Sequence, residues 1–251
     1  MSSPPPGLPP PGPPRDRPNL KGAPAKPPDK VWNFVGLWNV IRTGRPPTPV
    51  PSEGFIAFTP QYEARRRELE RLDNSGVAIP GRVAKCLPSG LPDMMTFGFN
   101  VFANAEYMTV IGGYGTVQVI WLDRKEHTPA PKLFPSYGGE SIAHWEGDTL
   151  IVDVVGLDPT NEIVYALPAD DPDLHIVERW KLLDKNTLQV VIIVDSKLAL
   201  TRPWAYTMVY GRRPSSDLIN GVMYCDRPLV NNNSLDLTPP IGGYIPPGAD
   251  K

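Results

Sequence analysis

The chain has 251 residues, of which 41% are hydrophobic and 21% charged, so it can bury a core and is not disordered overall. Its net charge of −2 and isoelectric point near 5.9 exclude the broad basic field that holds a nucleic acid or an anionic membrane. No stretch approaches the roughly 18 apolar residues that cross a bilayer. We therefore expect neither a nucleic-acid partner nor a membrane partner.

Proline dominates the start of the chain. Of the 33 prolines, 12 lie within the first 28 residues, where they favour extended polyproline geometry over helices and sheet ladders. We expect residues 1–30 to form an extended arm, solvated or lying across its own domain or a second subunit. Binding to an aromatic groove on a partner is the alternative. We expect a homodimer, to which this arm contributes.

A single folded domain is expected over residues 31–230, followed by a C-terminal tail over 231–251. The domain begins with VWNFVGLWNVI, which brings two tryptophans and a run of β-forming residues. A second proline-rich turn region follows at 45–54.

One helix is predicted, directly after this turn region. Thr59 is suited to the N-cap, Pro60 to the first helical position, and Asn74-Ser75-Gly76 to the end. Its arginines suggest a basic binding face, but glutamates interleave with them at helical spacings, which favours a solvated, self-paired face. The arginines are Arg65, Arg66, Arg67 and Arg71, and the glutamates are Glu63, Glu68 and Glu70.

From residue 95 onward, short β-like segments alternate with turn residues. The eight segments are FGFNVFA, EYMTVIGG, TVQVIWLD, SIAHWEG, TLIVDVVG, HIVERWKLLD, TLQVVIIVD and WAYTMVYGR. Because no helical pattern separates them, they predict an all-β, antiparallel, lipocalin-like barrel of about eight strands. A barrel of that size has room for one small ligand.

Cofactor and metal signatures are missing from the sequence. The histidines His127, His144 and His175 have no metal-ligand spacing, so we expect no metal site. The glycines of 112–115 join two strands and read as a hairpin turn, not a phosphate loop. No nucleophile elbow is present. We expect an activity that uses no cofactor.

Cys86 and Cys225 are the two cysteines, 139 residues apart. One disulfide and two buried thiols are both compatible with this spacing. The N-terminus lacks a basic segment followed by an apolar one, so we expect no secretory signal and a cytoplasmic protein. In that compartment the thiols would be free.

The segment GGESIAHWEGDTLIVD at 138–153 carries a family resemblance. It resembles the G-x-S-x-G-H-W-E-G-D-T-L-V-V-D-T signature of a large family of bacterial proteins, many of them exported and uncharacterised. CLPSGLPDMM at 86–95, VERW at 177–180, RPW at 202–204 and the late Cys225 follow that family's order. The resemblance covers about residues 31–230 and implies a fold family more than a reaction.

Departures from the family pattern point to one branch of it. QVIWLDRKEH at 118–127 replaces the usual R-x-I-x-x-D-G-R-x-H run, and PADDPD at 168–173 replaces P-H-S-E. The proline arm stands where exported relatives have a signal peptide. A cytoplasmic branch with aromatic substitutions on its strands is similar to the phenylcoumaran γ-formaldehyde lyases of lignin-degrading bacteria. The resemblance implies a lyase that acts on lignin-derived aromatic dimers.

That chemistry needs a base, a donor to the departing aryl oxide and aromatic walls, but no redox cofactor. A phenolate opens the dihydrofuran ring, the γ-carbon leaves as formaldehyde, and a stilbene remains. The candidate residues are His144 as base, Tyr107 and Tyr114 as donors, Arg124 for a substrate carboxylate, and Trp121, Trp145 and Trp204 as walls. Each of them also has a purely structural interpretation: a histidine beside a turn, a surface ion pair, or packed aromatic rings.

Two other functions stay open: a non-catalytic binding protein for a hydrophobic molecule, and an isomerase or hydrolase that uses the same pocket. A binding protein predicts an apolar pocket without titratable groups, whereas a lyase predicts at least two convergent polar groups deep in the barrel. If His144 is not the base, Glu106, Glu140 and Asp153 are the next candidates.

Overall fold

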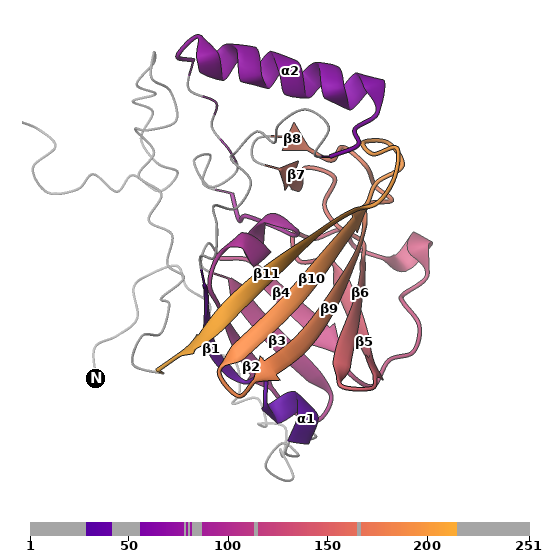
Figure 1. Cartoon of the computed structure of the whole chain (residues 1–251). Helices are drawn as coiled ribbons and strands as arrows, with labels where there is room; N and C mark the ends of the chain where they lie inside the picture. Colours follow the sequence, from indigo (N-terminus) through magenta and orange to yellow (C-terminus); the bar gives the residue numbers. More distant parts are fainter. Residues whose placement is uncertain are drawn as a thin grey trace, which may run out of the picture.

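The computed structural model describes residues 29–41, 56–77, 79, 81, 87–112, 115–164 and 167–214. Nine strands close into one barrel, in the order β1-β11-β10-β9-β6-β5-β4-β3-β2 (Figure 1). They are β1 (Gly36–Val40), β2 (Phe99–Ala103), β3 (Tyr107–Gly112), β4 (Val117–Trp121), β5 (Glu140–Glu146), β6 (Thr149–Val155), β9 (His175–Asp184), β10 (Thr187–Asp195) and β11 (Trp204–Arg213).

The remaining elements lie at the two ends of the barrel (Figure 1). At one end stands the main helix α2 (Pro60–Asn74), beyond a two-stranded ribbon of β7 (Glu162–Val164) and β8 (Leu167–Pro168). The short helix α1 (Asp29–Trp32) lies at the other end. Two 3₁₀ turns complete the described elements, η2 (Asp93–Thr96) and η3 (Ala130–Lys132).

The all-β barrel is confirmed; it has nine strands where about eight were predicted, and one pair is parallel where we expected an antiparallel barrel. All eight predicted segments are strands of the barrel. The ninth is β1, which comes from the segment that begins the domain and pairs with both β2 and β11. One pair, β4 with β5, is parallel. The barrel thus differs in detail from the lipocalin-like one that we expected.

Several predictions from the sequence concern residues that the structure does not describe. They are Cys86, Cys225, the tail, the turn region at 45–54, and all but the last two residues of the arm. Among the residues that are described, no helix is long and apolar enough to cross a membrane.

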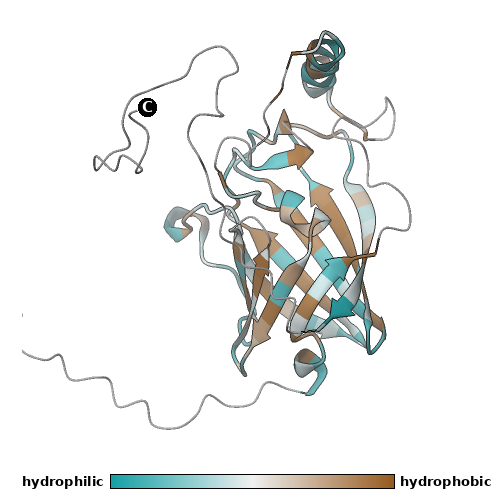
Figure 2. Cartoon of the chain, turned by 90° about the vertical axis from the view of Figure 1, so that its left-hand side faces the viewer, coloured by the Kyte–Doolittle hydropathy of each residue, from teal (hydrophilic) through white to brown (hydrophobic). Residues whose placement is uncertain are grey.

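Alternation of side chains along each strand builds the core. In β10, Leu188, Val190, Ile192 and Val194 are fully buried, and the residues between them are not. Because successive side chains of a strand point to opposite faces, this pattern places one apolar row inside the barrel. Figure 2 shows largely hydrophobic strands beside a mostly hydrophilic α2.

Aromatic rings fill the end of the barrel near α1. Phe99 lies 5.4 Å from Trp180 and 4.7 Å from Tyr210, ring centre to ring centre, and Phe34 meets the edge of Trp180 at 5.9 Å. Trp38 is fully buried and donates its indole N–H to the Phe34 carbonyl at 2.7 Å. Each such side chain buries about 150–250 Å², which contributes at most about 4–6 kcal/mol of hydrophobic free energy.

Arg212 of β11 joins three chain segments at this end. Its guanidinium donates to the carbonyls of Asn33 at 2.6 Å, Val35 at 2.7 Å and Lys185 at 2.9 Å. It also lies 4.2 Å from the ring centre of Trp38. Arg212 therefore fastens the chain that enters β1 to the β9–β10 turn.

Helix α2 begins and ends where the sequence predicts, and Thr59 occupies the N-cap position, but its side chain makes no capping hydrogen bond. The Thr59 hydroxyl donates instead to the Leu198 carbonyl at 2.9 Å, and so ties the helix to the chain before β11. Self-pairing is confirmed for Arg66 with Glu63 at 2.8 Å and Arg71 with Glu68 at 2.7 Å, but Arg66 is buried and not solvated, and Arg65 pairs instead with Asp170 at 2.6 Å.

The Arg212 junction requires glycine at position 36. Gly36 has φ +133°, and a Cβ there would lie 3.0 Å from Arg212 Nη1. We expect Gly36→Ala to lower the free energy of unfolding by about 1–3 kcal/mol, measured by urea denaturation. Gly147→Ala is the control, because Gly147 also has a positive φ of +59° but no atom within 4 Å of its Cβ position. Equal losses in both variants would contradict the clash.

Candidate active site

An opening in the barrel wall follows from the one parallel strand pair. β4 and β5 share only two residue pairs, Ile120 with Ser141 and Trp121 with Ile142. β4 ends at Trp121, whereas β5 continues to Glu146. Residues 143–146, here called the lower half of β5, therefore have no partner strand on the side of β4. The connection between them, residues 122–139, must cross over the outside of the barrel because a parallel pair cannot be joined by a hairpin.

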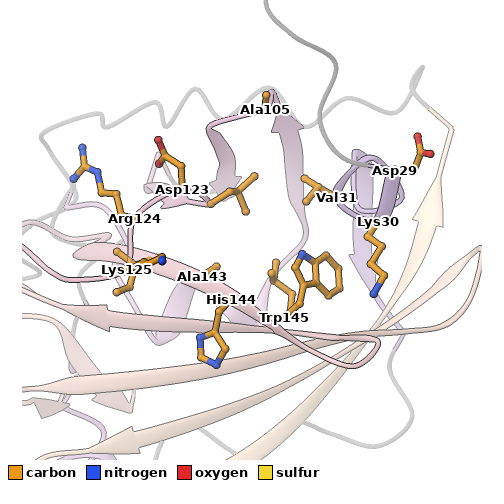
Figure 3. A pocket seen from close by; sticks show the side chains of 13 residues that line it. Asp29, Lys30, Val31, Ala105, Asp123, Arg124, Lys125, Ala143, His144 and Trp145 are labelled. Carbon is orange, nitrogen blue, oxygen red and sulfur yellow. The ribbon is translucent and has the colours of Figure 1, made fainter.

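A pocket of about 660 Å³ lies at this opening. It is bounded by the lower half of β5, the start of the crossover and α1 (Figure 3). Its apolar lining consists of Val31, Ala105, Leu122, Ile142, Ala143, Trp145 and Leu150. Its polar rim consists of Asp29, Lys30, Asp123, Arg124, Lys125 and His144. Pockets that hold small molecules have this size and this mixture of apolar walls with a few polar groups.

Two predicted residues, His144 and Trp145, lie next to each other on the lower half of β5, with their side chains on opposite faces of the strand. By strand alternation the ring of Trp145 lies on the inner side, 6.0 Å from Phe34 and with Lys30 Nζ 5.2 Å from its centre. His144 borders the pocket from the outer side; its side chain is 63% exposed and its Nε2 lies 3.6 Å from Glu146 Oε1. The imidazole is therefore reachable from solvent, and it projects to the opposite side of β5 from Trp145 (Figure 3).

Arg124, Trp121 and Tyr107 form a stack on the outer wall beside the pocket. The Arg124 guanidinium lies 3.6 Å from the ring centre of Trp121, which meets Tyr107 edge-on at 5.4 Å. Arg124 Nη1 is 3.8 Å from Glu140 Oε2. Arg124 thus reaches the rim, while Tyr107 and Trp121 support it from outside the barrel and do not line the pocket.

The two other predicted residues do not join this group. Trp204 lies at the opposite end of the barrel, stacked on Tyr206 at 4.7 Å beside a smaller cavity of about 280 Å³. Tyr114 is outside the described residues.

All three histidines lie around Asp153, which the sequence analysis names as a candidate base; only their convergence was not predicted. Asp153 Oδ1 lies 2.5 Å from His175 Nε2 and 3.9 Å from His127 Nε2. The His175 bond is the main cause that lowers the pKa of Asp153, and His127 and His144 act in the same direction. The same bond raises the pKa of His175.

Glu140 holds His127 from the other side. Its Oε1 lies 3.2 Å from His127 Nδ1, and Thr128 binds it through the backbone N–H at 2.7 Å and the hydroxyl at 2.6 Å. Burial acts to raise the pKa of Glu140, but these hydrogen bonds outweigh it and the pKa is lowered. Within the described ranges no group of three such side chains is placed to hold a metal ion. Hydrogen bonds and ion pairs thus link Glu140, His127, Asp153 and His175 into one network.

A second unpredicted group lies inside the barrel. Glu178 of β9 is fully buried, accepts the indole N–H of Trp180 at 2.8 Å and accepts the Gln118 amide at 3.2 Å. Burial raises the pKa of Glu178 to about 7, although both hydrogen bonds act to lower it. Alternation could have revealed it, since Glu178 stands between the inward-facing Ile176 and Trp180.

No family model, no curated protein and no solved structure matches the chain. The family resemblance drawn from the sequence motifs therefore stays a prediction.

The Asp153–His175 pair predicts a pH-dependent stability. Its contribution requires ionised Asp153 and protonated His175, so it is present between the lowered pKa of Asp153 and the raised pKa of His175 and is lost on either side. We expect Asp153→Asn to lower the melting temperature more at pH 5.5 than at pH 9. Both side chains are about 40% exposed, so the difference is under about 1 kcal/mol.

Asp148→Asn is the matched control. Asp148 pairs with Lys181 at 3.1 Å, and a lysine keeps its charge over this pH range. The effect of the control variant should be the same at both pH values. An Asp153→Asn effect that is equally flat would contradict the ionic pair.

Proposed function

We propose that the protein is a cofactor-independent lyase that acts on lignin-derived aromatic dimers of the phenylcoumaran type, releasing formaldehyde and leaving a stilbene. The observation that carries the proposal is the pocket at the barrel opening. It gathers three residues chosen for this chemistry from the sequence: His144 as base, Trp145 as an aromatic wall and Arg124 for a carboxylate. The acid–base chemistry rests on this geometry, and the substrate class on the sequence resemblance.

The pocket suits a molecule with two rings and polar ends. Its volume of about 660 Å³ falls in the range of small-molecule sites. The apolar walls around Trp145 offer contact to a ring, and Lys30, Arg124 and Lys125 offer positive charge to a phenolate or carboxylate. Figure 3 shows Asp123 and Arg124 on one side of the pocket and Asp29 and Lys30 on the other.

The proposed reaction is redox-neutral. His144 takes the phenol proton, and the phenolate expels the aryl oxide from the ring carbon, which gives a quinone methide. The aryl oxide takes up that proton. A base then takes the proton of the γ-hydroxyl, the bond between the β- and γ-carbons breaks, and this proton finally goes to the product phenolate. Formaldehyde leaves, and the electron pair restores the aromatic ring and forms the stilbene double bond.

A lipocalin-like binding protein for a hydrophobic aromatic molecule is the alternative, and an isomerase or hydrolase would use the same groups. The acid–base network around Asp153 and the buried Glu178 favour an enzyme, because a purely binding barrel needs no titratable group. We further propose a cytoplasmic homodimer with free thiols at Cys86 and Cys225.

Turnover should depend on His144 and not on a metal ion. A panel of phenylcoumaran dimers, followed by stilbene absorbance and a formaldehyde assay, should reveal activity that survives dialysis against EDTA. His144→Ala should lower kcat by about 10²–10⁴-fold, as expected for a lost general base. Tight binding of a dimer without any turnover would replace the lyase by the binding protein. Unchanged turnover in His144→Ala would move the base elsewhere.

Arg124 should select substrates that carry a carboxylate. Arg124→Gln should raise KM about 10-fold for a carboxylated dimer and leave KM for the neutral dimer unchanged, since only the carboxylate loses its charged partner. Arg202→Gln is the control, because Arg202 lies by the cavity at the opposite end. Equal effects on both dimers would show that Arg124 only packs on Trp121.

A further inference from the structure

One polar cluster lies inside the barrel, apart from the rim of the pocket. It consists of Glu178 on β9, Gln118 on β4 and Ser141 on β5, all with no more than trace exposure. The Gln118 amide nitrogen donates to Glu178 Oε1 at 3.2 Å and lies 3.1 Å from Ser141 Oγ. Trp180 donates to the other carboxylate oxygen at 2.8 Å.

The cluster has an unused acceptor. Gln118 Oε1 is buried and has no hydrogen-bond partner among the described residues. Buried carbonyl oxygens in native proteins nearly always receive a hydrogen bond, so this one points to a donor that enters from outside the chain. Glu178 offers two oxygens beside it, each with a further lone pair. An alcohol hydroxyl, with one proton to donate and an oxygen of its own, matches this pair of acceptors.

The cluster adjoins the pocket through β5 and β6. Ser141 is the next inward-facing residue on β5 after Ala143, which lines the pocket, so the two lie about 7 Å apart along the strand. Ala143, Val152 and Glu178 also sit on one row across three neighbouring strands. The cluster therefore begins one inward-facing position along β5 from the pocket lining, and a molecule that reaches it must pass the fully buried Val152.

We propose that Glu178 and Gln118 form an internal subsite for an alcohol hydroxyl of the bound molecule, with Glu178 as the acceptor of its proton. This inference rests on the proposed lyase in naming the hydroxyl as the γ-hydroxymethyl group. The O–H proton passes to Glu178, the bond between the β- and γ-carbons breaks, formaldehyde forms, and the electron pair moves into the quinone methide. Glu178 then returns the proton to the product phenolate through solvent.

The surroundings of Glu178 suit both the uptake of the hydroxyl proton and its later release. A carboxyl with a pKa of about 7 accepts and releases protons near neutrality. Its hydrogen-bond donors Trp180 and Gln118 are neutral. The titratable groups toward it from other elements are Tyr206 and Tyr210 of β11; burial raises the pKa of both, and Asp93 of η2 adds to the effect on Tyr206. Both phenols therefore stay neutral.

The test compares two probes on the full-length protein. One is the phenylcoumaran alcohol made by oxidative coupling of coniferyl alcohol, and the other is its γ-deoxy analogue, which lacks only the hydroxyl. Calorimetry with a non-phenolic methyl ether of each probe measures binding without turnover. Wild type should prefer the alcohol by about 10-fold, and Glu178→Gln and Gln118→Leu should each abolish most of that preference. Glu68→Gln on α2 is the control and should retain it.

A measurement on wild type covers the case in which a variant fails to fold. In protein labelled with ¹³C at glutamate carboxyls, the alcohol should shift the Glu178 resonance and the deoxy probe should not. The inference is overturned if the variants retain the preference for the alcohol. It is also overturned if the alcohol and the deoxy probe shift the Glu178 resonance equally. Both conclusions hold even where formaldehyde release is found. A preference that Glu178→Gln removes, without any formaldehyde release, supports the subsite and refutes the lyase.

Discussion

The parallel pairing of β4 with β5 is the constraint on which the site depends. Every other neighbouring pair in the barrel is antiparallel, a geometry that a short hairpin can connect. The parallel pair instead needs a long connection across the outer wall. That connection, residues 122–139, carries Arg124 to the rim and His127 to Asp153. The same pairing is short, and it leaves the lower half of β5 open to the pocket. The parallel β4–β5 pair thus accounts both for the opening in the barrel wall and for the polar groups that its connection brings there.

The Asp153–His175 pair and Glu178 differ in burial, and this difference gives them different chemical properties. Asp153 and His175, on the outer wall, reach solvent and hold each other charged. Glu178, inside, has only neutral donors, so an ionised carboxylate there loses much of its hydration without a cation in return. Burial raises the pKa of Glu178 for this reason, although Trp180 and Gln118 both donate hydrogen bonds to it. A carboxyl retained at that position is therefore better explained by a function than by stability.

Most of the barrel could be predicted from local pattern, whereas the site could only partly be. Strand alternation and turn residues identify eight of the nine barrel strands because both signals lie within a few residues. The segment of β1 was noted only as a run of β-forming residues; its place in the barrel could not be predicted because its partners are distant in the sequence, Trp38 pairing with Phe99 and Arg212. His144 and Trp145 are neighbours on one strand, so their proximity was certain. The meeting of His127 with Asp153 depends on the path of the crossover, which sequence spacing does not encode.

The pairing of β1 with β11 also bears on how the protein reaches its native state. Trp38 and Arg212 are direct neighbours in the sheet although most of the chain separates them. Such a contact closes a very long loop, and its entropic cost must be met before the contact returns any free energy. β11, the last strand among the described residues to be synthesised, is thus one that closes the barrel. Until then the nascent chain presents two open sheet edges, which are templates for intermolecular association. Because β11 is synthesised after the other described strands, these sheet edges stay unpaired, and open to aggregation, until all of those strands have been made.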